Sequence, residues 1–158
     1  MLRAQLHRQS HTTGSRAAQS RLHNLVVFSV AGQRLAARTE EIGGVLPWPG
    51  TTPVPSDTPF VTSLIRYEDS CLPVFDLAAR LQGTMRDTHS LCLIVKHVDG
   101  PLAIRIDAEV PSLHAVPRSD VQYQSGPDPD LAGSCVAAGQ QLPLINLATL
   151  GVASRRPA

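Results

Sequence analysis

Short apolar runs, broken by glycine and proline, dominate the hydrophobic pattern of this chain. Residues 25–30 (LVVFSV) and 91–95 (LCLIV) are almost wholly apolar, which is typical of buried strands. Residues 102–107 (LAIRID) instead alternate, with leucine and isoleucine on one face of an extended chain and alanine, arginine and aspartate on the other. This is the period of a half-buried strand, and no segment shows the pattern of a long buried helix.

The same series of segments occurs twice along the chain. Residues 72–78 (LPVFDLA) match residues 142–148 (LPLINLA), and residues 35–38 (LAAR) match residues 102–105 (LAIR), in the same order. Each copy therefore begins with an apolar strand, a glycine turn and a second strand. A proline-rich stretch follows, and each copy ends with a hairpin that leads into a short helix.

Two features of the repeat predict how each copy ends. Pro73 and Pro143 cannot donate a backbone hydrogen bond, so we expect them on edge strands or at bulges. Asp76 and Asn146 follow as N-caps, since their side chains can accept from the first free amides of a helix. Short helical turns are thus predicted after residues 76 and 146, over Leu77–Leu81 and Leu147–Leu150.

These patterns predict an all-β protein of two tandem small barrels packed together. The first copy spans about residues 25–83 and the second about residues 91–150, within one domain over residues 23–150. A chain of 158 residues is long enough for two such barrels with a shared core. The 13 prolines and 11 glycines agree with many turns and few helices.

Charge is distributed unevenly along the chain. Residues 1–39 hold six arginines and no acid, whereas the remainder holds eight basic and thirteen acidic residues. Residues 1–22 lack the apolar periodicity needed to bury surface, so we expect a disordered basic tail, and we expect a flexible C-terminus over residues 151–158. The start also has the composition of an organelle transit peptide, and a basic tail can bind nucleic acid or anionic lipid, but a solvated tail is favoured.

The sequence contains no run near the roughly 18 consecutive apolar residues that a membrane-spanning helix requires, so we expect a soluble protein. Cys71, Cys92 and Cys135 are odd in number, far apart and each within an apolar run. This usage predicts reduced core thiols in a cytosolic protein, not disulfides.

Candidate catalytic motifs are incomplete. Residues 69–71 (DSC) lack a glycine that would expose a nucleophile, and residues 87–89 (DTH) lack the glycine of an aspartic-protease loop. Asp107 and Glu109 can share a strand face, yet the sequence supplies no partner that would shift their pKa values, so a solvated outer face is favoured. A small β-barrel hydrolase that uses these carboxylates or the Ser70 and Cys71 region remains an alternative, as does nucleic-acid binding by the basic tail.

A metal site is also disfavoured. His89 and Cys92 are three residues apart at the start of a predicted strand, which points their side chains to opposite faces. Their spacing matches no common ligand template. We therefore predict no metal at these residues.

The order and spacing of these segments resemble the CheW-type coupling proteins of bacterial chemotaxis over residues 25–150. Matching segments are residues 25–30 with Gly32, residues 41–46 before Pro47, residues 72–77 with Leu81 and Gly83, residues 104–107, and residues 142–150. Each segment alone is weakly specific. Their common order and spacing carry the resemblance.

The resemblance implies two SH3-like five-stranded β sub-barrels packed on each other, with no catalysis and no cofactor. It also implies a cytoplasmic adaptor that couples the regulatory domain of a chemotaxis-type histidine kinase to the cytoplasmic tip of a chemoreceptor. A substitute input protein in a motility or pilus pathway can take the place of the receptor. In that family the kinase domain pairs sub-barrel to sub-barrel with the coupling protein, and the receptor helix lies in a groove beside the join.

One segment departs from the family pattern, Gly-x-x-Asn-x-Arg-Gly. Ser63 and Asp69 replace the two glycines, Arg66 replaces the asparagine, and Glu68 replaces the arginine. The inverted charge at Glu68 predicts a change of partner, because like charges at an interface cost affinity. The predicted partner-binding residues are Leu64, Arg66, Glu68, Asp69 and Val45.

Overall fold

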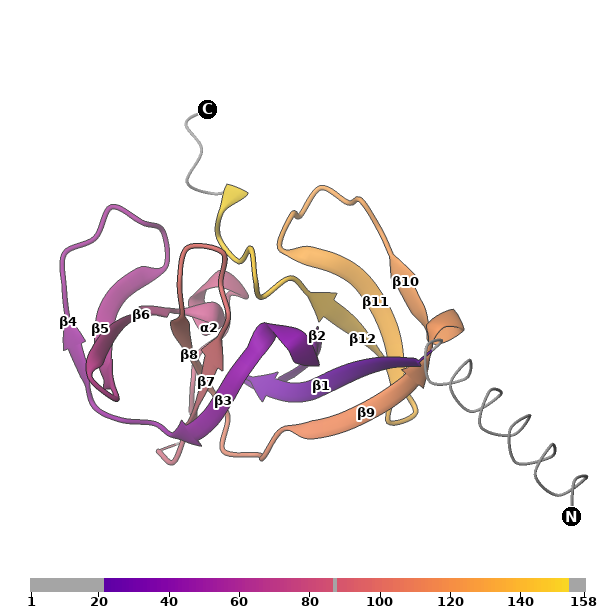
Figure 1. Ribbon diagram of the computed structural model, residues 1–158, viewed down its shortest axis with the longest axis horizontal. Coiled ribbons are helices and arrows are strands. Elements are labelled where there is room, and N and C mark those ends of the chain that lie inside the picture. The colour runs from indigo at the N-terminus through magenta and orange to yellow at the C-terminus, as the bar shows by residue number, and fades with distance from the viewer. Residues whose placement is uncertain (1–21, 87, 154–158) are drawn as a thin grey trace, which may run out of the picture.

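The computed structural model describes residues 22–86 and 88–153, and within them the fold is almost entirely β. Two six-stranded sheets curl and lie side by side (Figure 1). The strands are β1 (Leu22–Val30), β2 (Gln33–Arg38), β3 (Ile42–Pro47), β4 (Thr51–Pro53), β5 (Val61–Tyr67), β6 (Ser70–Phe75), β7 (Leu91–Val95), β8 (Leu102–Ile106), β9 (Ser112–Pro117), β10 (Val121–Tyr123), β11 (Leu131–Ala137) and β12 (Gln140–Ile145). One short helix, α2 (Leu77–Arg80), and the 3-10 turns η1 (Thr39–Glu41) and η2 (Arg118–Asp120) complete the described elements.

The predicted all-β fold with two packed barrel-like units is confirmed. Each unit has six strands, whereas five were expected. The additional strands are β4 and β10, three residues each, which pair with the outer sides of β5 and β11. The predicted basic tail, apart from Leu22, lies outside the described residues. The nucleic-acid alternative depends on that tail. The predicted flexible C-terminus beyond Ala153 also lies outside them.

The two sheets exchange hairpins between the copies of the sequence repeat. Sheet A has the order β10-β11-β12-β2-β1-β9, and sheet B, read in the equivalent direction, has the order β4-β5-β6-β8-β7-β3. Each sheet thus combines four strands of one copy with the first hairpin of the other copy. The strand order therefore corrects the expectation that residues 25–83 build one barrel and residues 91–150 build the other. Because the two hairpins have matching sequences, the repeat alone does not determine which sheet each hairpin completes.

The pairing register agrees with the sequence repeat. In sheet A, β12 pairs parallel to β2 with Leu144 opposite Ala36. In sheet B, β6 pairs parallel to β8 with Val74 opposite Ala103. These two pairs hold the same positions in the two copies, so the repeat describes the strands and their register even though the hairpins are exchanged.

The position of the prolines differs from the prediction. Pro73 lies in β6, which has β5 on one side and β8 on the other, so it is not on an edge strand. The ladder between β6 and β8 begins at Val74, one residue after the proline. Pro73 therefore lies just before the first residue of β6 that pairs with β8. At that position no backbone N–H group has to donate to β8, so proline is tolerated. Pro143 precedes Leu144 in β12 in the same way.

The predicted cap of the first short helix is present. The Asp76 carboxylate accepts a hydrogen bond from the Ala79 N–H group at 3.0 Å, at the start of α2. Leu77 and Ala78 then turn inward and are buried. A single capping side chain at the end of β6 thus redirects the chain from strand to helix, as the sequence predicts.

The second predicted cap is wrong. The Asn146 side-chain oxygen accepts a hydrogen bond from Arg38 at 3.0 Å, and its amide group donates to the Pro129 carbonyl at 3.2 Å. Because both groups are engaged by distant residues, Asn146 caps no helix. Residues 147–150 form a hydrogen-bonded turn, in which the Leu150 N–H group donates to the Leu147 carbonyl at 3.2 Å.

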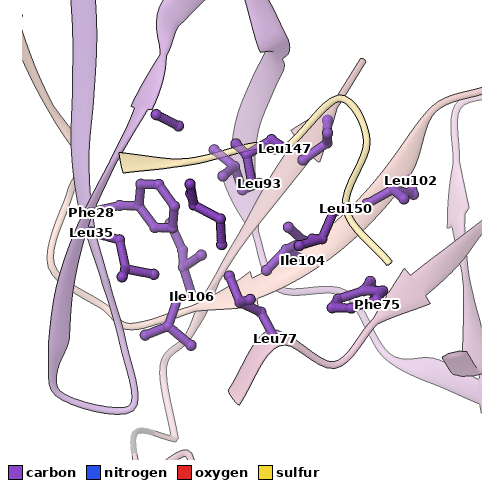
Figure 2. Packing of buried hydrophobic residues seen from close by; sticks show 14 of the residues in the cluster. Phe28, Leu35, Phe75, Leu77, Leu93, Leu102, Ile104, Ile106, Leu147 and Leu150 are labelled. Carbon is purple, nitrogen blue, oxygen red and sulfur yellow. The ribbon is translucent and has the colours of Figure 1, made fainter. Parts of the chain in front are cut away.

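A central core joins the two sheets. Its sixteen buried residues come equally from the two halves of the chain, eight from residues 26–78 and eight from residues 93–150. Figure 2 shows Phe28 and Leu35 of the first hairpin close to Ile106, and Leu150 close to Ile104 and Leu102. Full burial of one such side chain contributes roughly 1.5–3 kcal/mol. The core therefore fixes the two sheets relative to each other.

Candidate protein-docking site

An apolar groove lies between the edge strands of the two sheets, and we call it the join groove. Its volume is about 280 Å³. It is lined by Val26, Thr39, Ile42, Gly43, Gly44, Val45, Val110, Pro111 and Leu113. Three of these apolar side chains are well exposed, since Val45 is 43%, Val110 76% and Leu113 75% accessible to solvent. Neighbouring apolar side chains left in water mark a surface suited to a protein partner.

The topology explains why the groove is open. In the described part of the chain, β3 pairs only with β7 and β9 pairs only with β1, so each forms the edge of its sheet. Gly43 and Gly44 bring no side chains to the groove floor, and a Cβ atom on Gly43 would lie 3.3 Å from the Ile94 side chain. The groove thus lies where two sheet edges come close together, and the two adjacent glycines have no side chains that could fill it.

The structure separates the predicted partner-binding residues into two surfaces. Val45 lies in the join groove. Leu64, Arg66, Glu68 and Asp69 instead belong to the β5–β6 hairpin, and none of them lines the groove. Leu64 is half-buried, whereas the other three are exposed.

The inverted charge lies at the tip of the β5–β6 hairpin. Glu68 and Asp69 connect Tyr67 to Ser70, the last pair of the ladder. Glu68 has a φ of 53°, which is in the left-handed region that favours glycine. Both acidic side chains therefore project from a tight turn into solvent, where they can meet a partner first.

Sequence reasoning missed Val110 and Leu113. Both follow the second copy of the repeat hairpin, in a stretch interpreted only as irregular and proline-rich. A usable signal was present, because residues 45–47 (VLP) in β3 resemble residues 115–117 (AVP) in β9. Aligning those endings makes β9 the equivalent of the edge strand β3, with Leu113 in β9 and Val110 just before it.

The carboxylate pair considered for catalysis is bonded to the first hairpin. Asp107 accepts hydrogen bonds from the backbone N–H groups of Ala31 at 3.0 Å and Gly32 at 2.9 Å. Glu109 pairs with Arg34 at 3.1 Å. The expected solvated face describes Glu109, whose side chain is 61% exposed, whereas the half-buried Asp107 holds the β1–β2 turn against the segment after β8.

Two buried acids connect segments that are distant in sequence. Glu41, only 5% exposed, pairs with Arg38 at 3.3 Å and accepts from the Ala148 N–H group at 2.8 Å. Asp130, 4% exposed, pairs with Arg80 at 3.1 Å and accepts from the Gly151 N–H group. Removal of one partner from such a buried pair is costly, so these contacts keep the join rigid.

The pKa values of the two arginines reflect these pairs. Burial by itself lowers the pKa of Arg38, but the hydrogen bonds and negative charge of Glu41, with a contribution from Tyr123, raise it above its ordinary value. For Arg80, burial likewise lowers the pKa, while Asp128 and Asp130 raise it to a greater extent. Both arginines therefore stay charged.

The three cysteines differ in exposure. Cys92 and Cys135 are buried, as the sequence predicts, but Cys71 is exposed, so the expectation of a third core thiol is wrong. Cys71 lies at the second position of β6, next to the hairpin tip, where the apolar run has not yet entered the core. Burial raises the pKa of the Cys92 thiol to about 11 and also raises the pKa of the Cys135 thiol.

One thiol per folded chain is expected to react quickly with Ellman's reagent at pH 8, and three after denaturation. The raised pKa of Cys92 leaves only about one thiolate in a thousand at that pH, and burial blocks access as well. A spectrophotometric titration of native and denatured protein measures both numbers. The variant Cys71→Ser should lose the fast reaction, and two fast thiols in the native wild-type protein would contradict the burial.

No group of three or more His, Cys, Asp or Glu residues that could hold a metal ion occurs among residues 22–86 and 88–153. None of the described helices is long and apolar enough to cross a membrane. Two exposed features of the described surface are therefore candidates for docking, the apolar join groove and the acidic hairpin tip.

Comparison with known proteins extends over nearly the whole described chain. The family model of the CheW-like domain matches residues 24–153. Similar solved structures include the scaffolding protein TtCheW from Thermoanaerobacter tengcongensis, with 18% sequence identity and a TM-score of 0.70, over 82% of this chain and 92% of that chain. No curated protein sequence matches the chain. At this low identity the structural likeness shows the fold, and the family model shows the relationship.

Proposed function

Since this chain belongs to the CheW-like domain family, we propose that it is a non-catalytic adaptor in bacterial chemosensory signal transduction. It acts in the cytoplasm and couples a chemotaxis-type histidine kinase to a chemoreceptor or to a substitute input protein. The pathway is one of chemotaxis, motility or pilus control. The function consists of holding two partners at once, so it requires two separate docking surfaces.

The join groove is the observation that carries this proposal. Val45, Val110 and Leu113 present apolar side chains on either side of a hollow whose walls are fixed by the central core. A helix with one apolar face buries those side chains without a rearrangement of the sheets. The groove therefore suits the helical tip of a receptor or of a similar input protein.

The β5–β6 hairpin provides the second surface in this proposal. Arg66, Glu68 and Asp69 are exposed beside the half-buried Leu64, and we assign this surface to the regulatory domain of the kinase. Because two acids occupy the turn in place of the arginine and glycine usual in the family, the matching partner surface is expected to be basic. The same negative charges disfavour binding to a kinase whose surface is complementary to an arginine at this position.

The variant Leu113→Asp is expected to weaken binding of a receptor-tip helical hairpin at least tenfold, which corresponds to about 1.4 kcal/mol. A carboxylate placed in an apolar contact remains desolvated without a partner, whereas the free protein tolerates it because Leu113 is 75% exposed. Isothermal titration calorimetry measures the dissociation constant. Circular dichroism checks that the fold is intact.

Val136→Asp is the matched control, because Val136 is 44% exposed on β11 and does not line the join groove. It should bind like the wild type. Equal affinities for the wild type and Leu113→Asp would remove the groove from the binding surface. Equal losses in both variants would show a nonspecific effect of added charge.

A further inference from the structure

A second pocket lies on sheet B, between the start of β6, the β7–β8 turn and residues 150–151, and we call it the turn pocket. Its volume is about 420 Å³. Exposed Ser70 and Cys71, at the base of the β5–β6 hairpin, belong to its lining. The pocket therefore adjoins the surface assigned to the kinase, and it shares no residue with the join groove. Its walls include the buried side chains of Leu72, Phe75, Leu102 and Leu150.

The sequence repeat provides an internal comparison for this pocket. Residues 58–61 (TPFV) lead into β5 as residues 128–131 (DPDL) lead into β11. The N–H group of the residue after β6 donates to the Phe60 carbonyl at 2.7 Å, and that of the residue after β12 donates to the Asp130 carbonyl at 2.8 Å. The two segments therefore hold equivalent positions beside the two sheets.

The equivalent position beside sheet A is occupied by an arginine. Arg80 pairs with Asp128 at 2.6 Å and with Asp130 at 3.1 Å. It follows β6 at the same spacing as Leu150 follows β12. Leucine is shorter than arginine, so a hollow is left beside sheet B. The residues of sheet B that replace the arginine and the two acids are Leu150, Thr58 and Phe60.

This replacement determines which side chain suits the turn pocket. Arg80 is held by two carboxylates, and neither has a counterpart in the residues that lead into β5. A cation inserted beside these residues would lose water without the acids that hold Arg80. A large apolar side chain instead removes apolar area from water on both surfaces. The turn pocket is therefore the apolar counterpart of a position that the fold otherwise fills with a long charged side chain.

The charged groups around the turn pocket have both signs. Asp99 belongs to the lining, is 53% exposed, and has its carboxylate 3.8 Å from the His97 Nδ1 atom. Lys96, Asp57 and Asp69 are exposed and adjoin lining residues in sequence. Recognition by the pocket is assigned to its apolar walls, and none of these charges is given a contact with the ligand.

The walls are in place before any ligand binds. The His97 side chain is 4% exposed, and its Nε2 atom lies 2.9 Å from the Leu150 carbonyl oxygen, within hydrogen-bond distance. The Val98 N–H group donates to the Ala148 carbonyl at 2.8 Å. These contacts fasten the β7–β8 turn to the segment after β12, so two parts of the lining are held together. A preformed pocket lowers the ordering cost of binding.

We propose that the turn pocket binds one large apolar side chain, of the size of leucine or phenylalanine, from the protein that docks on the β5–β6 hairpin. The proposal rests on the proposed function for the identity of that partner, the regulatory domain of the kinase. The inserted side chain lies against Leu72, Phe75 and Leu102. A single apolar anchor in a fitted pocket is a common source of affinity at interfaces, and the charged hairpin tip next to it then selects the partner.

Toluene and benzylammonium are the probes for the ligand class, measured with the full chain in ¹H–¹⁵N NMR spectra. Toluene should cause concentration-dependent shifts in the amides of the turn pocket, and benzylammonium should bind at least fivefold more weakly. Thr58→Asp introduces the acid of the other copy and should weaken toluene binding at least fivefold, because a carboxylate disfavours an apolar ligand. Thr58→Val, the matched uncharged variant, should bind toluene like the wild type. Equal binding of the two probes, or of toluene by wild type and Thr58→Asp, would overturn the proposal.

The same two variants test the partner. The surface that meets the acidic hairpin tip is expected to be basic, so an added acid would strengthen binding if charge alone mattered. Thr58→Asp is instead expected to weaken binding of the kinase regulatory domain at least fivefold relative to Thr58→Val, measured by isothermal titration calorimetry. Unchanged or stronger binding by Thr58→Asp would show that the partner inserts no apolar side chain. If the kinase domain binds no form of the chain while toluene binds as expected, the proposed function fails and the apolar pocket stands.

The chain's own C-terminal residues are the other possible occupant. A chain that ends at Ala153 should bind toluene with the same affinity as the full chain. Binding at least fivefold tighter by the shorter chain would mean that residues 154–158 fill the pocket, and the assignment to a partner would be wrong.

Discussion

Residues 1–86 and residues 87–158, produced as separate chains, are each expected to remain unfolded, and the two chains mixed together are expected to fold. The cut falls in the connection between the two copies of the repeat, outside every strand. Each half alone lacks the hairpin that completes its own sheet, since β7–β8 stands between β6 and β3, and β1–β2 stands between β12 and β9. Each half also keeps only eight of the sixteen residues of the central core.

Far-UV circular dichroism and NMR spectra of each half, and of an equimolar mixture, measure this result. Loss of half a core removes many contributions of roughly 1.5–3 kcal/mol, more than the whole stability of a typical domain. A matched control is the full chain with a protease site inserted after residue 86, which should stay folded after cleavage. Cooperative unfolding of either half on its own would contradict the exchange of hairpins.

Gly133→Ala is expected to destabilise the fold by about 4 kcal/mol or more, one of the largest effects of a single methyl group in this protein. Gly133 lies at the irregularity in the pairing of β11 with β12, with a φ of 149°. A Cβ atom there would lie 1.8 Å from the Gln122 carbonyl oxygen, far inside contact distance. The obstacle is backbone of the adjacent strand β10, which cannot rotate away as a side chain would.

Urea denaturation measures the free energy of unfolding of Gly133→Ala. Gly126→Ala is the control, because a Cβ atom on Gly126 meets nothing within 4 Å and its φ is not in the left-handed region. The control should change stability by less than about 1 kcal/mol. A Gly133→Ala protein as stable as the wild type would mean that β10 and β11 are farther apart than described.

The sequence predicted most of the local structure but not the exchange of hairpins. Apolar runs, glycine turns and the two matching LAxR segments identify strands that the structure confirms, and Asp76 identifies α2. The first hairpins of the two copies have matching sequences, so each could pair equally well with the strands of either sheet. The sequence therefore does not show which copy supplies the hairpin of each sheet. The predicted cap at Asn146 is wrong because of another contact between distant parts of the sequence. Arg38 donates a hydrogen bond to the side-chain oxygen that a cap would need.

The docking surface was only partly accessible from the sequence. Val45 belongs to the join groove, but so do Leu113 on the second edge strand β9 and Val110 just before that strand, and only the pairing of the strands brings them beside Val45. A groove between two edges is a tertiary feature with no local pattern. The role assigned to Leu64, Arg66, Glu68 and Asp69 stays a prediction, because their exposure makes them available without identifying a partner.

Simultaneous binding is the property that defines an adaptor, and size-exclusion chromatography with light scattering measures it directly. The chain would be mixed with a receptor-tip helical hairpin, with the regulatory domain of a chemotaxis-type kinase, and with both. We expect two binary complexes and one ternary complex in which each component is present once, since the join groove and the β5–β6 hairpin are separate surfaces. Failure to bind either partner, or competition between them for the chain, would contradict the account.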